Sequence, residues 1–247
     1  MKRDILFNVA TEPHQWERSK QIMERTHKIC FDRLNPANFD GVLLDLDDTI
    51  YRYAPCHDAA ICACFEHHGF GLSLSTFRLQ YRAARDEITQ ALAPQASCRS
   101  RMFAFQKLAE GAGVPSAYNL AYILDEIYWS RFIDAMVPDP QALAFLKRCT
   151  QLSVPTCIVT DMTAHIQIRK ITRLGIAPYI THLVTSEEVG AEKPDRRMFE
   201  TAVGKLGVEI ERCLMLGDSL TKDVEGARAA GIAAHLVILP KEGSHGG

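Results

Sequence analysis

Short apolar runs alternate with helical patterns along most of this 247-residue chain, and this alternation restricts the fold more than any other feature. Each run is short enough for a buried strand of a parallel sheet. The runs lie at residues 42–44, 156–159, 182–185, 213–216 and 235–238, and helices are expected at about 163–174, 195–206 and 221–230. The pattern predicts an α/β fold with a Rossmann-like, doubly wound parallel sheet core that has helices on both faces.

A long helical stretch interrupts this core. Between residues 55 and 137 the sequence has no strand pattern, and we predict four helices, at about 55–69, 75–93, 100–110 and 116–136. The α/β core would comprise residues 41–54 and 138–240, with an inserted all-helical cap domain of residues 55–137 that can cover a site. Residues 1–40 are expected to form an N-terminal extension with a helix at about 15–33, and residues 241–247 a flexible tail.

Composition and charge argue against several classes of protein. The formal net charge is −2, so no basic surface for nucleic acid or an anionic membrane is indicated. No apolar run approaches the roughly 20 residues of a membrane span. Eight cysteines are scattered through predicted helices and strands, which favours reduced thiols in a cytoplasmic protein. A zinc site among the cysteines and histidines of residues 56–68 is an alternative, but paired C-x-x-C spacing is lacking.

Polar side chains follow three of the predicted strands. Asp45 and Asp47 come after the first, and they leave the backbone on the same side because side chains alternate along an extended chain. Thr160 closes the second run and Asp218 follows the fourth. Ligands of open α/β sheets bind beyond the carboxyl ends of the strands, so these groups are expected to converge there. Two crowded carboxylates repel each other and need a cation, a shared proton or different roles.

Four motifs, in this order, resemble those of the haloacid dehalogenase-like (HAD) superfamily, in its phosphatase branch with a helical cap of the first type. They are Asp45-Leu46-Asp47-Asp48-Thr49, Thr160, Lys193 in Glu192-Lys193-Pro194-Asp195, and Gly217-Asp218-Ser219-Leu220-Thr221-Lys222-Asp223. The resemblance covers about residues 41–240. Within the phosphatase branch, the chain resembles N-acylneuraminate-9-phosphatase and phosphoglycolate phosphatase-like members.

The resemblance implies a Mg²⁺-dependent phosphomonoester hydrolase that acts on a small metabolite of the sugar phosphate, phosphoglycolate or nucleotide type. Asp45 would attack phosphorus to give an aspartyl-phosphate, and Asp47 would protonate the leaving oxygen and then activate water. Mg²⁺ would bind the carboxylates of Asp45 and Asp218 and the main-chain carbonyl of Asp47. Asp223 would lie outside these ligands and hold a metal-bound water or Lys193.

The same resemblance assigns the phosphate-binding groups. Thr160 would donate its hydroxyl to a phosphate oxygen, with the backbone N–H of Asp161 beside it. Lys193 would neutralise charge on the phosphoryl group and steady the nucleophile. Because Asp47 can supply a proton, ester hydrolysis is favoured over dehalogenation, in which halide leaves without one.

Other interpretations fit parts of the pattern. Taken alone, residues 47–49 could form a turn, residues 192–195 a solvated loop, and residues 218–219 a helix cap. A phosphomutase would use the same aspartyl-phosphate, and a non-enzymatic phospho-acceptor module would use a similar set of groups. A metal-dependent glycosyltransferase would explain the first aspartate pair but not Lys193. The sequence leaves the substrate and the oligomeric state open.

Arginines in the second cap helix offer one hint about the substrate. They recur at helical spacing, as Arg78, Arg82 and Arg85. They could meet a second anionic group, but a solvated face paired with Asp86 and Glu87 is favoured. Tyr51 and Tyr53 lie at the hinge between cap and core and are better placed to touch substrate, unless Tyr51 packs there instead.

Overall fold

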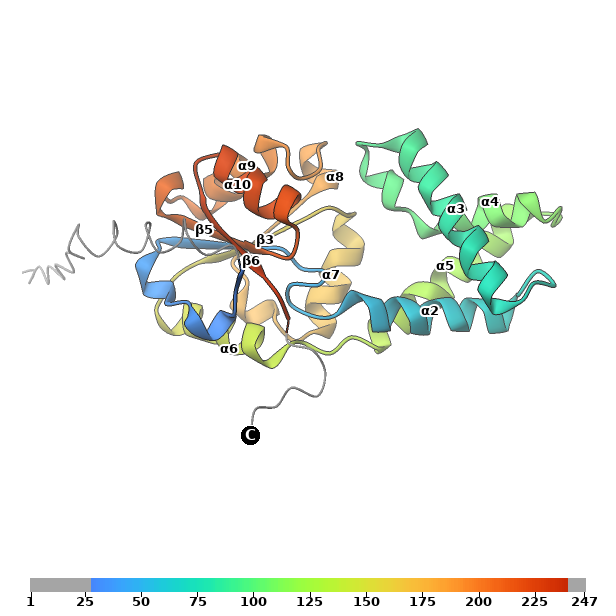
Figure 1. Cartoon of the computed structure of the whole chain (residues 1–247), viewed down its shortest axis with the longest axis horizontal. Coiled ribbons are helices and arrows are strands. Elements are labelled where there is room, and N and C mark those ends of the chain that lie inside the picture. The colour runs from blue at the N-terminus through green and yellow to red at the C-terminus, as the bar shows by residue number, and fades with distance from the viewer. Residues whose placement is uncertain (1–27, 240–247) are drawn as a thin grey trace, which may run out of the picture.

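A six-stranded sheet forms the centre of the protein. The computed structural model describes residues 28–239 (Figure 1). The strands are β1 (Lys28–Ile29), β2 (Gly41–Leu44), β3 (Thr156–Thr160), β4 (His182–Thr185), β5 (Cys213–Gly217) and β6 (Ala233–Val237). All pairs are parallel, in the order β1-β6-β5-β2-β3-β4. The predicted fold class is confirmed, and β2 lies at the point where the strand order reverses, where open sheets bind ligands.

Side chains of the sheet alternate between two apolar layers. Val42 and Leu44 of β2 belong to one cluster, whereas Leu43 belongs to the other. The first cluster includes residues of α6 (Pro140–Gln151) and α7 (Ala164–Arg173), and the second includes residues of α9 (Arg196–Leu206) and α10 (Gly226–Ala229). Burial on both faces explains why the strands read as continuous apolar runs.

Short helical turns complete the connections between strands and helices. They are η1 (Phe31–Arg33), η2 (Pro36–Asn38), η3 (Ala96–Arg99), η4 (Ala177–Tyr179), α8 (Ser186–Val189), η5 (Ile210–Arg212) and η6 (Leu220–Glu225). The last of these is a short π-helix that follows β5 after Asp218 and Ser219.

The N-terminal helix expected at 15–33 lies mostly outside the described residues. Within the described part, residues 28–33 contain β1 and η1, so the prediction of a continuous helix is wrong for these residues. Phe31 and Leu34 are buried, and Arg148 of α6 donates to both of their carbonyl oxygens at 2.9 Å. A two-residue strand is too short to give a periodic signal, so only tertiary pairing defines it. The expected tail at 241–247 also lies outside the described residues.

Four helices form a lobe beside the sheet (Figure 1). They are α2 (Tyr53–His67), α3 (Leu74–Leu92), α4 (Arg101–Gly111) and α5 (Ala117–Asp134), close to the predicted bounds. One face of α3 packs inward, with Phe77, Tyr81 and Ala84 buried. Ser73 and Ser100 cap α3 and α4, accepting backbone N–H groups at 3.2 and 3.3 Å.

The cysteines do not form cross-links or a metal centre in the described chain. All eight are free thiols, and Cys56 and Cys64 are buried in the helical lobe. The only grouping of potential metal ligands found among residues 28–239 consists of aspartates, so the zinc alternative gains no support. Across these residues, every helix is too short or too polar to cross a membrane.

Candidate active site

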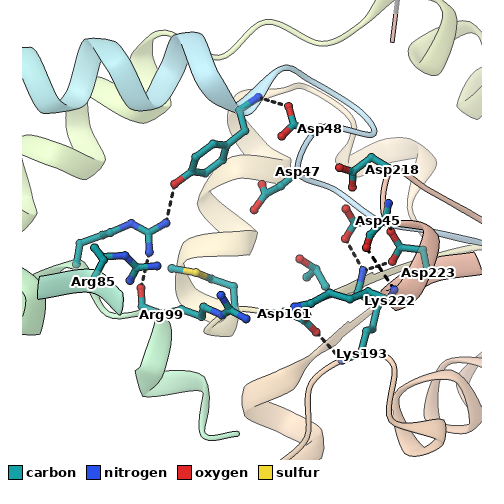
Figure 2. A pocket seen from close by; sticks show the side chains of 15 residues that line it. Asp45, Asp47, Asp48, Arg85, Arg99, Asp161, Lys193, Asp218, Lys222 and Asp223 are labelled. Atoms are coloured by element: carbon teal, nitrogen blue, oxygen red, sulfur yellow. Dashed lines mark hydrogen bonds and ion pairs between the residues drawn. The ribbon is translucent and has the colours of Figure 1, made fainter. Parts of the chain in front are cut away.

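One cavity at the carboxyl ends of β2, β3 and β5 receives every site residue that the sequence predicts. Its volume is about 410 Å³. From the core it is lined by Asp45, Asp47, Thr160, Asp161, Lys193, Asp218 and Asp223. Figure 2 shows the carboxylates and Lys193 on one side of this space, with arginines of the helical lobe on the other. Parallel strands bring these groups together because their carboxyl ends share one edge of the sheet.

Lys193 is the electrostatic centre of the core side. Its Nζ donates to Asp45 Oδ1 and to Asp223 Oδ1, each at 2.6 Å, and its side chain is only 3% exposed. Burial works against its charge, but the two carboxylates prevail and the pKa of Lys193 is raised. Burial, reinforced by the charges of Asp223 and Asp47, raises the pKa of Asp45 well above its usual range, despite Lys193.

Three carboxylates crowd this lysine. Oxygens of Asp45, Asp218 and Asp223 lie within 4.8 Å of one another. Burial, followed by the charges of Asp223 and Asp48, raises the pKa of Asp218 to about 6. One lysine cannot balance three carboxylates, and closely grouped carboxylate oxygens are the ligands that a hard divalent cation prefers. The donor set therefore fits Mg²⁺.

The backbone of the last motif is shaped around Asp223. Asp223 Oδ2 accepts the N–H of Ser219 at 3.0 Å. A Cβ at Gly217 would stand 2.2 Å from Asp223 Oδ2, so this position has no room for a side chain. Glycine is thus required here by close approach.

Asp47 is held by two residues from outside the predicted set. Lys170 of α7, which is 1% exposed, donates its Nζ to both carboxylate oxygens of Asp47, at 2.8 and 3.0 Å. The hydroxyl of Tyr51 donates to Asp47 Oδ1. Burial raises the pKa of Asp47, but Lys170 and Tyr51 outweigh it, and the net shift is downward. Tyr51 is fully buried, so it packs beneath the site and positions Asp47.

Thr160 and Asp161 close the core side of the cavity. Thr160 is 2% exposed, and its Oγ1 accepts from Gln167 Nε2 at 2.5 Å. The Asp161 carboxylate accepts the Lys193 N–H at 2.8 Å and the Lys222 ammonium at 2.7 Å. The side chain of Asp161 therefore ties two loops together, a role distinct from the backbone contact that the sequence predicts for it.

Asp48 has a structural role at the start of α2. Its φ of 56° places it in the left-handed region, and its Oδ1 accepts the N–H of Tyr53 at 2.8 Å, at the start of α2. Tyr53 lines the cavity, and its hydroxyl accepts from Arg101 Nη2 at 2.8 Å.

The helical lobe contributes three arginines, Arg85, Arg99 and Arg101. Arg99 makes a bidentate pair with Glu192 of the core, at 2.8 and 2.5 Å. The sequence pattern identified only Arg85 of the three.

The expected pairing of the α3 arginines is wrong in detail. Arg78 pairs with Asp58 of α2 at 2.6 Å, and Glu87 pairs with Lys107 at 2.5 Å. Arg85 is half-buried and faces the cavity instead of forming part of a solvated face. Helical spacing alone cannot distinguish these positions, because neighbouring helices decide which arginines are covered.

Comparison with known proteins agrees with this geometry. The model of a family described as haloacid dehalogenase-like hydrolase matches residues 39–231. The chain belongs to this family. A ribulose-1,5-bisphosphate 5-phosphatase from Halopiger xanaduensis is 33% identical over 196 residues, which cover 78% of this chain and 82% of that protein. A glyceraldehyde 3-phosphate phosphatase from Methanopyrus kandleri is 31% identical, with coverage of 78% and 81%.

A solved structure supports the fold of this HAD-like hydrolase. The putative HAD-hydrolase YfnB from Bacillus subtilis, bound to magnesium, superposes with a TM-score of 0.63 at 22% identity, covering 79% of this chain and 87% of that one. The predicted enzyme class, a phosphoric monoester hydrolase, is confirmed, because both of these relatives, which span most of the chain at 31–33% identity, are named phosphatases. The roles of individual residues stay predictions.

Proposed function

We propose that this protein is a Mg²⁺-dependent phosphomonoester hydrolase that works through an aspartyl-phosphate on Asp45. The observation that carries the proposal is the contact of Lys193 with both Asp45 and Asp223 at 2.6 Å, beside Asp218 and Asp47 in one cavity. A lysine beside the nucleophile lets a carboxylate approach an anionic phosphoryl group, because it offsets the repulsion between them.

The residues suggest a division of labour. Asp45 attacks phosphorus, Lys193 balances charge on the phosphoryl oxygens, and Thr160 donates its hydroxyl proton to one of them, since Gln167 already supplies a donor to Thr160 Oγ1. The backbone N–H of Asp161 is the second phosphate donor that we propose. These groups hold the phosphate in line with the nucleophile.

Asp47 handles the protons. It protonates the leaving oxygen as the bond to phosphorus breaks, and then takes a proton from the water that hydrolyses the aspartyl-phosphate. Lys170 and Tyr51 orient its carboxylate for both steps.

The carboxylates of Asp45 and Asp218 and the main-chain carbonyl of Asp47 would hold Mg²⁺, which supplies positive charge to the phosphoryl group. Asp223 would support them through Lys193. The grouping of carboxylate oxygens within 4.8 Å supports this assignment.

The proposed substrate is a small phosphorylated metabolite in the cytoplasm, and residues 55–137 act as a cap domain that covers it. Relatives named for ribulose bisphosphate and glyceraldehyde 3-phosphate favour phosphorylated sugars of three to five carbons. The cavity of about 410 Å³ is of the size that holds such molecules.

Phosphate release from a panel of sugar phosphates, phosphoglycolate, nucleoside monophosphates and an aryl phosphate tests the proposal. Release should require Mg²⁺ and stop with EDTA. Asp45→Asn should abolish it, and Asp47→Asn should slow turnover severely and accumulate phosphoenzyme. Asp32→Asn, at an exposed residue of η1 outside the cavity, is the matched control and should keep wild-type rates. Wild-type-like release by Asp45→Asn would overturn the mechanism.

A further inference from the structure

The arginines of the helical lobe are not explained by phosphoester hydrolysis itself. Arg85 lies across the cavity from Asp45 and Asp47 (Figure 2), and Arg101, the first residue of α4, lines the same cavity. The chemistry at phosphorus is supplied by core groups, so positive charge across the cavity must meet another part of the substrate or serve the fold.

The third arginine, Arg99, has a carboxylate partner in Glu192. For Arg85 and Arg101, no carboxylate lies within 4.0 Å among residues 28–239. Guanidinium groups stay charged in proteins, and a covered charge is costly unless it is compensated. Two guanidinium groups therefore line this cavity without a salt-bridge partner.

Arg101 is built into the lobe and fixed in place. It is 5% exposed, it donates to the carbonyl of Arg99 at 2.7 Å and to the hydroxyl of Tyr53, and it stacks over Tyr128 and Trp129. Its Nε is buried and has no hydrogen-bond partner. A guanidinium held rigidly in this way costs little entropy when its accessible N–H groups bind an anion.

Arg85 is the freer of the two. The hydrogen bond from its Nη1 to the carbonyl of Ser100 is 3.4 Å long. Burial, and then the charge of Arg101, lower the pKa of Arg85, which reflects the same lack of a counter-ion. Arg85 also lines a second cavity of about 230 Å³ between α2 and α3, together with Tyr53 and His57. Arg85 thus stands where the far end of an extended substrate would reach.

We propose that Arg85 and Arg101 form a subsite for a second anionic group, so that the preferred substrate is a phosphomonoester bearing a further phosphate or carboxylate. The inference rests on the proposed function and names the substrate class of the same cavity. One end of the molecule lies on the aspartates and Lys193, and the anionic other end lies against the arginines. Arginine suits either anion, because its planar fork matches phosphate and carboxylate alike.

Matched substrate pairs test the subsite. We would compare kcat/KM for a pentose 1,5-bisphosphate with that for the pentose 5-phosphate, and phosphoglycolate with ethyl phosphate. The first pair reports on a second phosphate and the second on a carboxylate. Hydrogen bonds between charged groups predict a preference of about 10- to 100-fold for the doubly anionic member of at least one pair.

Substitution of Arg85 assigns the preference to this residue. Arg85→Gln should lower the ratio of kcat/KM within the preferred pair by about 10- to 100-fold, and Arg85→Lys should retain part of it. Lys107→Gln removes one charge from the exposed surface of the same lobe and should leave the ratio unchanged. Thermal denaturation of each variant checks that the lobe stays folded.

Each outcome separates the two proposals. Hydrolysis without a preference in either pair, or a ratio that Arg85→Gln leaves intact, overturns the subsite while the phosphatase function stands. If no substrate releases phosphate in the presence of Mg²⁺, the proposed function itself is overturned.

Discussion

Removal of the divalent cation should lower the stability of this protein by an amount that depends on pH. Without a metal, the carboxylates of Asp45, Asp218 and Asp223 lie within 4.8 Å of one another and share one lysine. A cation that binds only the folded chain, at a hundredfold excess over its Kd, adds about 2.7 kcal/mol to the free energy of unfolding. At about 2–4 °C per kcal/mol, Mg²⁺ should raise Tm by about 5–11 °C near pH 7.

The pKa of Asp218, raised to about 6, sets the pH dependence. Proton and cation compete for this carboxylate, so the apparent Kd for Mg²⁺ should rise about tenfold from pH 7 to pH 5. The gain in stability then falls to about 1.4 kcal/mol, or about 3–6 °C in Tm. In EDTA the sign is opposite: the folded pKa exceeds the unfolded value, so the contribution of Asp218 increases as pH falls through 6.

Thermal denaturation with Mg²⁺ and with EDTA, at pH 5 and pH 7, measures both effects. Asp218→Asn should lose most of the gain in Tm and its pH dependence. Glu87→Gln, at a side chain that is 59% exposed, should keep both and serves as the matched control. An equal gain at the two pH values, or an undiminished gain in Asp218→Asn, would refute the assignment of the cation to this cluster.

Two further substitutions test the contacts around the site. Lys170→Met keeps the apolar part of the side chain but removes the charge that contacts Asp47 at 2.8 Å, so the free energy of unfolding measured in urea should fall by about 2–3 kcal/mol. The pKa of Asp47 should then rise, and the acid limb of the pH profile of kcat should move to higher pH. An unchanged urea midpoint would contradict this expectation. Gly217→Ala forces the Asp223 carboxylate to move, so it should lower the free energy of unfolding by about 1–3 kcal/mol and remove most of the activity. Gly204→Ala is the control: a Cβ there meets nothing within 4 Å, so this substitution should be neutral or slightly stabilising.

Most of the core was predictable because local and tertiary preferences agree there. The strands are covered on both faces, so they are apolar throughout and stand out from the helices between them. Asp45, Thr160 and Asp218 lie at strand ends, and the geometry of a parallel sheet brings them together without further information. The exception in the core is α6, which the sequence analysis missed although Asp139 caps it and Pro140 opens it.

Polar residues with buried roles were the harder part. The spacing of Ile168 and Ile171 would place both on one apolar face of α7, but Ile168 is 54% exposed. The covered face consists of Ile166, Gln167, Lys170 and Ile171. A lysine and a glutamine on that face weaken the apolar pattern, and they lie there because they contact Asp47 and Thr160. A functional site thus accounts for the failure of the periodicity argument.

A contact between the lobe and the core lies next to Lys193, a proposed phosphate-binding residue of the site. Arg99 of η3 forms a salt bridge with Glu192, and this pair is largely buried, with 26% and 13% of the two side chains exposed. The next residue along the chain is Lys193, whose Nζ holds Asp45 and whose N–H is fixed by Asp161. The loop that the lobe contacts is therefore the loop whose lysine contacts Asp45, the proposed nucleophile. The contact between Arg99 and Glu192 therefore links the position of the lobe to the position of Lys193. A substrate that binds the arginines of the lobe would also favour the position of Lys193 beside Asp45 that attack on phosphorus requires.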